Sequence, residues 1–204
     1  MWAYYDRRVA HRGPGPQNVL HYFRGLGVAA DLNEINSELS AVARCLGQLA
    51  ATTFLDLGAG PDGTFTMQSA GRGIAIDQSE AALLQLHAVA PSLPIVRGDV
   101  MRLPVRDKAV GRVFISHLYG LLLPDERAAL LTEAWRAGRE VVVLDSGRPP
   151  GAEPEAWQTR SLPDGASYRI YRRHLNAEEL AVEVGGSVVF GGKYFVMTIT
   201  TASD

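Results

Sequence analysis

The stretch FLDLGAGPDG, residues 54–63, holds the residues best suited to chemistry in this 204-residue sequence. An apolar run stops at Gly58, and Gly60 and Gly63 follow at the spacing G-x-G-x-x-G. Such glycines allow a sharp turn after a strand and let the backbone approach a ligand closely, beside the N–H groups of the next helix. Asp56 stands two residues before the first glycine, and a carboxylate there suits a cationic group of a ligand.

Two further acids follow the next two predicted strands. Asp77 comes about 20 residues after Gly58, where a dinucleotide-binding sheet carries its ribose-binding acid. Asp99 follows the third strand in VRGDVMRLP. The glycine spacing alone is weak evidence, because a tight strand-to-helix turn without a ligand also produces it. It leaves NAD(P) or FAD open beside S-adenosylmethionine, and Asp56 with Asp99 favours the latter.

A sheet of parallel strands is needed to bring these acids to one edge. Short apolar segments alternate with helical ones from residue 52 onward, which predicts crossover units and an α/β sheet with helices on both faces. The uniformly apolar strand cores fit burial on both sides. The predicted strands are 52–58, 73–79, 94–99, 110–117 and 140–147, and the predicted helices are 64–70, 79–90 and 124–138.

The two ends of the chain depart from this alternation. Residues 1–16 read as a loop ending in GPGP, 17–27 as a short helix and 32–50 as an amphipathic helix. We interpret residues 1–50 as an N-terminal helical cap or lid and residues 51–204 as the ligand-binding domain, in one compact unit. After residue 147 we expect a long loop (148–157), an extended or loop segment (169–175), a helix (176–185) and two strands around a GGK turn (187–201).

Composition excludes several classes of protein. The net charge of −2, from 20 basic and 22 acidic residues, argues against a protein that wraps phosphate backbones, so a nucleic-acid partner is not expected. Cys45 is the only cysteine, which rules out intrachain disulfides, and no Cys/His cluster offers a metal site. No apolar run is long enough for a membrane helix or a signal peptide, so we expect a cytoplasmic protein without a membrane partner.

Four segments resemble, in order and spacing, the signature segments of the class I S-adenosylmethionine-dependent methyltransferases. They are LDLGAGPDG, GIAIDQS, RGDVMRLP and GRVFISHLYGLL. The resemblance covers about residues 50–147 and is closest to the small single-domain enzymes that act on small molecules. It implies S-adenosylmethionine as cofactor, S-adenosylhomocysteine as product, and a Rossmann-like open sheet, mostly parallel, closed by a C-terminal antiparallel hairpin.

The resemblance also implies a role for each matched residue. Gly58 and Gly60 would lie under the methionine part of the cofactor, with Asp56 near its amino group. Asp77 would accept hydrogen bonds from the ribose hydroxyls. The other implied contacts are Gln78 beside the adenine, Asp99 and the Val100 backbone at the adenine edge, and Ser116 and His117 beside the sulfonium methyl.

His117 is the candidate general base for an acceptor that must lose a proton. Many members of the family have Asn or Asp at this place, so packing on the cofactor is an equal alternative. Tyr119 is a candidate for the acceptor pocket, and Tyr4, Tyr5 and Arg12 are candidates for a lid over the cofactor, with a solvated arm as the alternative. A group of residues later in the chain would suit an acidic or phosphorylated substrate, with a solvated face as the alternative. These residues are Trp157, Arg160, Tyr168, Tyr171 and Arg173.

Two other functions remain open at this point. An NAD(P)-dependent oxidoreductase is one, although the chain has no obvious Tyr-x-x-x-Lys pair. A non-catalytic S-adenosylmethionine-binding protein is the other. For a methyltransferase, SHLY at residues 116–119 replaces the Asn/Asp-Pro-Pro-Tyr/Phe signature, which lowers the odds of amino-methylation of DNA bases or protein glutamine. Oxygen, nitrogen, carbon and sulfur acceptors on small molecules remain, in a monomer or homodimer.

Overall fold

The computed structural model of the chain describes residues 2–9, 16–49, 53–69 and 71–201. Its helices are α1 (Trp2–Arg8), α2 (Pro16–Gly25), α3 (Leu32–Gln48), α4 (Glu80–Val89), α5 (Pro124–Ala137) and α6 (Ala177–Val184), with 3-10 turns η2 (Thr66–Gln68) and η3 (Tyr119–Leu121). Its strands are β1 (Thr53–Leu57), β2 (Arg72–Asp77), β3 (Ile95–Arg97), β4 (Val110–Ser116), β5 (Gly138–Ser146), β6 (Glu155–Ser161), β7 (Ser167–Arg173), β8 (Ser187–Gly191) and β9 (Phe195–Thr201).

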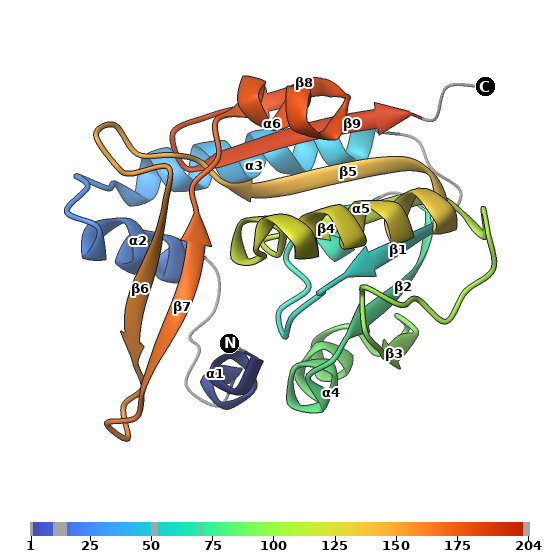
Figure 1. Cartoon of the computed structure of the whole chain (residues 1–204), viewed down its shortest axis with the longest axis horizontal. Coiled ribbons are helices and arrows are strands. Elements are labelled where there is room, and N and C mark those ends of the chain that lie inside the picture. The colour runs from blue at the N-terminus through green and yellow to red at the C-terminus, as the bar shows by residue number, and fades with distance from the viewer. Residues whose placement is uncertain (1, 10–15, 50–52, 70, 202–204) are drawn as a thin grey trace.

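A seven-stranded sheet in the order β3-β2-β1-β4-β5-β9-β8 forms the centre of the molecule (Figure 1). Strands β1 to β5 pair in parallel, and β9 pairs antiparallel with both β5 and β8. The strand order reverses between β1 and β4, so the carboxyl ends of these two strands flank the crevice where open α/β sheets bind ligands. The predicted mostly parallel Rossmann-like sheet, closed by an antiparallel hairpin, is confirmed.

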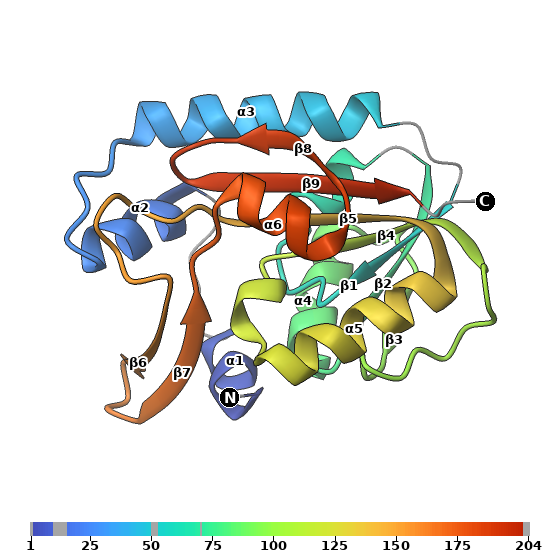
Figure 2. The ribbon, with the colours of Figure 1, turned by 45° about the horizontal axis from the view of Figure 1, so that its top comes forward.

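Alternate residues of the central strands face opposite layers of helices, as the period of two in a strand requires. Leu55, Val113 and Val143 pack with Leu130 of α5 and Leu180 of α6. Residues of the other parity pack against α2 and α3, and these are Phe114, Val142 and Leu144. Figure 2 shows α3 along one face of the sheet, with α5 and α6 on the other. This double coverage explains why the strand sequences are apolar throughout.

Strands β6 and β7 form a second, two-stranded antiparallel sheet between β5 and α6. It projects beyond the carboxyl ends of the parallel strands, beside α2 and α1 (Figure 1). The expected long loop at 148–157 is therefore wrong from Glu155 onward, and 169–175 is extended up to Arg173. Both strands of this hairpin lie largely at the surface, so polar residues alternate along them. Their sequences therefore lack the apolar run that indicates a buried strand.

Two other predictions need correction, and one boundary is not described. Residues 2–8, expected as a loop, form α1, whose Tyr4 packs against Leu162 and Ile170 of the hairpin region. The helix expected after the glycines is only the 3-10 turn η2. Such a short sequence has little helical tendency of its own, so packing decides its conformation. The boundary between residues 50 and 51 lies outside the described residues.

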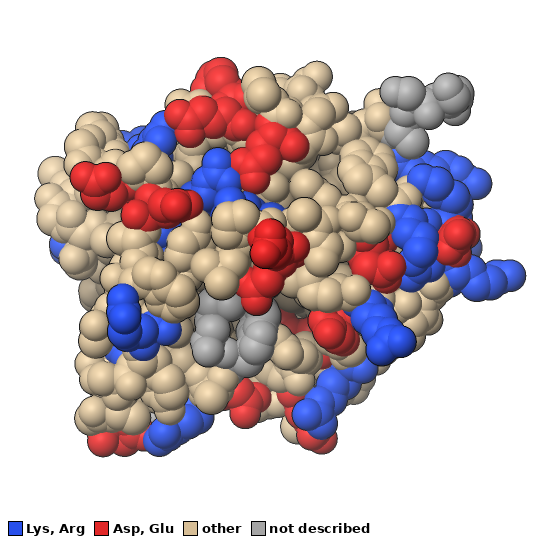
Figure 3. Space-filling model, in the orientation of Figure 1, with Lys and Arg blue, Asp and Glu red and all other residues tan. Residues whose placement is uncertain are grey.

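Charges of both signs are interspersed on the face of the molecule seen in Figure 3. Among the described residues, the Arg136 guanidinium bonds the carboxylates of Glu133 and Asp107 at 2.8 and 2.9 Å. No described helix has the length and apolar composition that crossing a bilayer requires.

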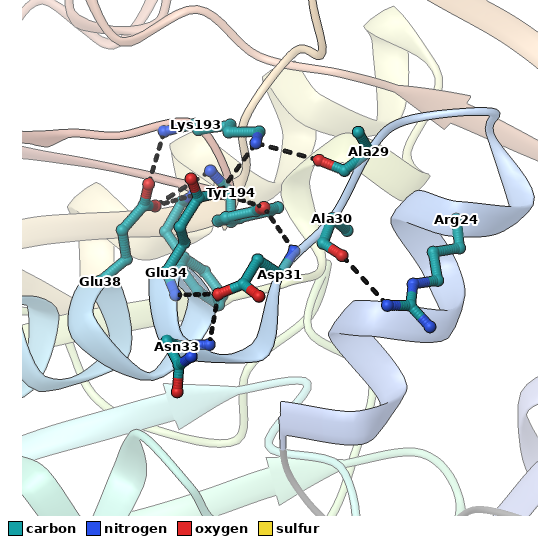
Figure 4. Close-up of polar contacts among 10 residues, drawn as sticks. Arg24, Ala29, Ala30, Asp31, Asn33, Glu34, Glu38, Lys193 and Tyr194 are labelled. Carbon is teal, nitrogen blue, oxygen red and sulfur yellow. Dashed lines mark hydrogen bonds and ion pairs between the residues drawn. The ribbon is translucent and has the colours of Figure 1, made fainter.

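A polar cluster fastens α3 to the turn between β8 and β9 (Figure 4). Glu38 accepts hydrogen bonds from the backbone N–H groups of Lys193, Tyr194 and Phe195 at 2.8, 2.9 and 3.1 Å. The Tyr194 hydroxyl donates to Glu34 at 2.8 Å. A carboxylate that binds three N–H groups fixes both the turn and the helix, so α3 is held on the sheet by polar as well as apolar contacts.

Substituting Glu38 with alanine should destabilise the fold. Three backbone N–H groups of the β8–β9 turn would lose their acceptor, and we expect a loss of about 2–4 kcal/mol in the free energy of unfolding. Urea unfolding measures it, with exposed Arg44→Ala on the same helix as control, expected within about 0.5 kcal/mol of the parent. Equal stability of the two variants would contradict the tether.

Candidate functional site

A cavity of about 620 Å³ opens at the carboxyl ends of the parallel strands. Its volume is typical of small-molecule sites. The glycine turn after β1 and the ends of β2 and β4 form one side, and α1, α2 and the β6–β7 hairpin form the other. Figures 1 and 2 show α1 and the hairpin beyond the ends of these strands. The sheet edge predicted to bind a ligand therefore lines this cavity.

The glycine turn has the backbone conformation that its sequence predicts. Gly58, Gly60 and Gly63 have φ angles of 69°, 65° and 58°, in the left-handed region that favours glycine. The Gly58 N–H donates to the Ile76 carbonyl at 2.8 Å, which holds the turn against β2. A Cβ on Gly58 would lie 2.9 Å from a Leu118 methyl, so close packing also requires glycine there. Gly58 and Gly60 both line the cavity.

Asp56 is a buried acid with an unused oxygen. Its side chain is 1% exposed and lines the cavity. Thr66 Oγ donates to Oδ2, whereas Oδ1 has no hydrogen-bond partner among the described residues. Burial raises the pKa of Asp56 to about 7, and the bond from Thr66 only partly opposes this effect. An unpaired buried carboxyl is costly, so a cationic ligand group beside Oδ1 would be strongly favoured.

Asp77 is the last residue of β2, and its carboxylate links this strand to the glycine turn and to the start of α4. Its Oδ2 accepts from the Gly60 N–H at 3.0 Å, and its Oδ1 accepts from the Ser79 N–H at 2.8 Å. Ser79 in turn caps α4, as predicted, by accepting from the Ala82 N–H. Burial raises the pKa of Asp77, and these N–H donors act in the opposite direction. The acid thus has fixed orientation and faces the cavity.

His117 stands at the end of β4 in a strained backbone conformation. Its φ of 51° is uncommon for a residue other than glycine and is often found at functional sites. The ring lies between Phe65 and Phe195, with ring centroids 5.6 and 5.8 Å away, and lines the cavity. Its Nδ1 is 3.5 Å from Asp145 Oδ1. A carboxylate at Nδ1 favours the tautomer that leaves Nε2 free to accept a proton.

Asp145 near the end of β5 does not line the cavity but contacts two residues that do, His117 and Arg172, and the sequence analysis did not identify it. Its side chain is fully buried, and it also binds Arg172 Nη2 at 2.6 Å and the Gly120 N–H at 2.8 Å. Burial raises the pKa of Asp145, but the charge of Arg172 and the contact with His117 outweigh burial and hold the pKa below its usual range. The sequence feature that could have identified Asp145 is its position near the carboxyl end of the fifth predicted strand, 140–147.

The structure brings most of the predicted residues to this cavity. Tyr4, Tyr5, Gln78, Val100 and Ser116 all line it. Asp99 does not line it, because its exposed carboxylate accepts from the Met101 N–H at 2.9 Å in a local turn, between lining residues Gly98 and Val100.

Tyr119 also lies away from the cavity, against expectation. The 3-10 turn η3 begins at this residue and directs its ring into the core formed with α5 and α6. Its hydroxyl donates to Glu183 at 2.8 Å. Arg12 lies outside the described residues. The N-terminal helix α1 is held in place through Asp6, whose carboxylate accepts from Ser79 Oγ at 2.6 Å.

The hairpin contributes residues of only one face to the cavity. Gln158 and Arg160 of β6 and Ile170 and Arg172 of β7 line it. Trp157 and Tyr171 oppose each other on the other face, with rings 5.8 Å apart, so these two do not reach the site. Arg172 gave no local signal in the sequence, because its place depends on the hairpin register. No group of three or more potential metal-binding side chains occurs in the described part of the chain.

Residues 55–141 match a family model described as a methyltransferase domain. No curated protein matches the sequence significantly. Solved structures share the fold, and DhpI in complex with SAH has 20% identity, coverage of 99% of this chain and 95% of that chain, and a TM-score of 0.71. The PH0226 protein from Pyrococcus horikoshii OT3 has 15% identity, with coverage of 90% of this chain and 99% of that chain and a TM-score of 0.66. The glycopeptide N-methyltransferase MtfA complexed with (S)-adenosyl-L-methionine has 16% identity, with coverage of 81% of this chain and 87% of that chain and a TM-score of 0.60.

The buried Asp56 should make stability depend on pH. Its raised folded-state pKa of about 7, against an ordinary value near 3.8, means that the folded chain holds a proton that the unfolded chain releases. This group therefore lowers stability as pH rises from about 4 to 7, by at most about 1.4 kcal/mol per pH unit. Asp56→Asn should remove this slope, so its stability relative to the parent should rise from pH 5 to pH 7. Parallel pH curves from urea unfolding would contradict the assignment.

Proposed function

We propose that this chain is a class I S-adenosylmethionine-dependent methyltransferase, which moves the methyl group to a nucleophile on a small molecule by in-line displacement. The observation that carries the proposal is that two acids of different character, the buried Asp56 and the half-buried Asp77, line one cavity with the glycine turn. When bound, S-adenosylmethionine supplies a methyl group on a sulfonium, which is electrophilic without further activation. The protein therefore has mainly to bind, orient and exclude water.

The residues present fit this cofactor. Asp56 Oδ1, buried and without a partner, suits the amino group of the methionine part. Gly58 and Gly60 leave the backbone open to it, and Asp77 is oriented by two N–H donors so that its remaining acceptor capacity suits ribose hydroxyls. Gln78 and Val100 line the same cavity and suit the adenine. Asp99 does not line the cavity, and one of its oxygens accepts from the Met101 N–H, so its contact with the adenine stays a prediction from the sequence.

His117 is the proposed general base for the acceptor. It lines the cavity at the end of β4, and Asp145 at Nδ1 favours a free Nε2 and stabilises the imidazolium formed when His117 accepts the proton. Two aromatic rings restrict its orientation. This arrangement supports acid–base catalysis more than simple packing on the cofactor.

The N-terminal segment, residues 1–50, is proposed to cap this site. Helices α1 and α2 line the cavity through Tyr4, Tyr5 and Tyr22, and Asp6 links α1 to the start of α4. Side chains in this position exclude water from the reacting groups. That the enzyme works in the cytoplasm, as a monomer or homodimer and without nucleic acid, stays a prediction from the sequence.

Cofactor binding tests the first part of the proposal. We expect calorimetry to show binding of S-adenosylmethionine and S-adenosylhomocysteine, and Asp77→Asn to raise both Kd values about 10–100-fold, because charged hydrogen bonds to the ribose are lost. Arg169→Gln, an exposed change on the hairpin, is the control and should leave Kd unchanged. Binding of NADH in place of S-adenosylmethionine would instead support an oxidoreductase.

Catalysis by His117 is tested with His117→Asn, since asparagine tolerates the positive φ of this position. We expect kcat for methyl transfer to fall about 10²–10⁴-fold while the Kd for S-adenosylhomocysteine changes only a few-fold. A panel of phenols, amines and carboxylic acids serves as acceptors. A large loss of cofactor affinity with unchanged kcat would mean that His117 only packs on the cofactor. Cofactor binding without transfer to any acceptor in a broad panel would favour a non-catalytic binder.

A further inference from the structure

The end of the cavity opposite the glycine turn is formed by the β6–β7 hairpin and α2. Antiparallel pairing sets Gln158 opposite Ile170 and Arg160 opposite Tyr168, so one face of the hairpin presents Arg160 and Arg172 to the cavity. Both guanidinium groups lie over the ring of Tyr22 of α2, at 5.0 and 5.7 Å from its centroid. Cation–π contacts of this kind hold the two charges near each other without neutralising either.

The two arginines differ in how far they are neutralised. Arg172 forms an ion pair with the buried Asp145, yet its Nε is buried without a hydrogen-bond partner among the described residues. Arg160 donates to the neutral Gln158 amide at 2.5 Å, and no ion pair from it to a described carboxylate is present. Two arginines and one acid leave an excess positive charge and free donors at this end of the cavity.

The acids that line the cavity lie elsewhere. They come from α1, β1, the glycine turn and the end of β2, namely Asp6, Asp56, Asp62 and Asp77. Within the described part of the chain, neither α2 nor the hairpin adds an acid to the lining. The lining acids thus lie on the side suited to the cofactor, where Arg8 and Arg97 also line the cavity, whereas the charged lining residues of the hairpin and α2 are both arginines. This second side is the basic half of the cavity, where an acceptor would lie.

Neighbouring groups respond to this positive charge. Burial lowers the pKa of His174, and Arg172 lowers it further. Burial raises the pKa of Tyr5 to about 12, against an opposing influence of Arg172, Arg8 and Arg160. His174 is therefore neutral and adds no further charge to this end of the cavity. Its Nε2 lies 2.6 Å from the Tyr22 hydroxyl.

We propose that the methyl acceptor is a small molecule carrying an anionic group, a carboxylate or a phosphate-type group, that binds at Arg160 and Arg172. The inference rests on the proposed function and names its substrate class. The same Asp145 oxygen contacts Arg172 and His117, so the anion site and the proposed base are close neighbours. The acceptor is accordingly a short molecule, with its nucleophilic atom only a few bonds from its anionic group.

Binding to the protein saturated with S-adenosylhomocysteine tests this without requiring turnover. Calorimetry measures the affinities of benzoate and of benzamide, which match in size but not in charge. The affinity of inorganic phosphate, measured in the same way, separates carboxylate from phosphate recognition. We expect one or both anions to bind at least 10-fold more tightly than benzamide. Arg160→Gln should remove this preference, Arg160→Lys should keep part of it, and Arg169→Gln on the opposite face should leave it unchanged.

The outcomes separate the two proposals. Equal binding of benzoate and benzamide with no binding of phosphate, or anion binding that Arg160→Gln leaves intact, would overturn the anion site. A rise in the Kd for S-adenosylhomocysteine in Arg160→Gln, measured without other ligands, would also overturn it, because Arg160 would then serve the carboxylate of the cofactor. Failure of the parent protein to bind S-adenosylhomocysteine would overturn the proposed function itself, whatever the anions do.

Discussion

The buried carboxylate of Asp145 is the interaction on which the site depends most. It is fully buried at the end of the central strand β5, and it contacts Arg172 of the hairpin, His117 after β4 and the Gly120 N–H of η3. A buried charge must be paired, so these contacts oblige three separate segments to meet at one point. The position of the basic half of the cavity and the orientation of the proposed base follow from the same requirement.

The two acids on the opposite side show how one sheet edge supports different chemistry. Asp77 accepts hydrogen bonds from backbone N–H groups, which favour its charged form, whereas Asp56 has one hydroxyl partner and one empty oxygen. Burial raises the pKa of both, but these donors differ in what they leave available to a ligand. Asp77 is an oriented acceptor, while Asp56 is a buried group that a cationic ligand would satisfy.

The hairpin gives the rigid sheet its specific pocket. An isolated two-stranded sheet is marginal in water, so β6 and β7 need the contacts of Arg172 with Asp145 and of Leu162 and Ile170 with Tyr4. The proposed cofactor side of the cavity is built on the central sheet, and the proposed acceptor side is built on this added element and α2. Such a division lets a common fold hold one cofactor while a peripheral segment selects the acceptor.

Sequence alone determined the central sheet, the glycine turn, the caps Ser79 and Asn176, and the placement of Asp56, Asp77 and His117 at the edge. These features follow from local rules, namely strand period, glycine conformation and the common edge of parallel strands. Only the tertiary structure decided the inward turn of Tyr119, the helix α1, the hairpin and the meeting of Arg172 with Asp145. The physical reason is that these depend on register and on the pairing of buried charge between segments far apart in the chain, which no local pattern encodes.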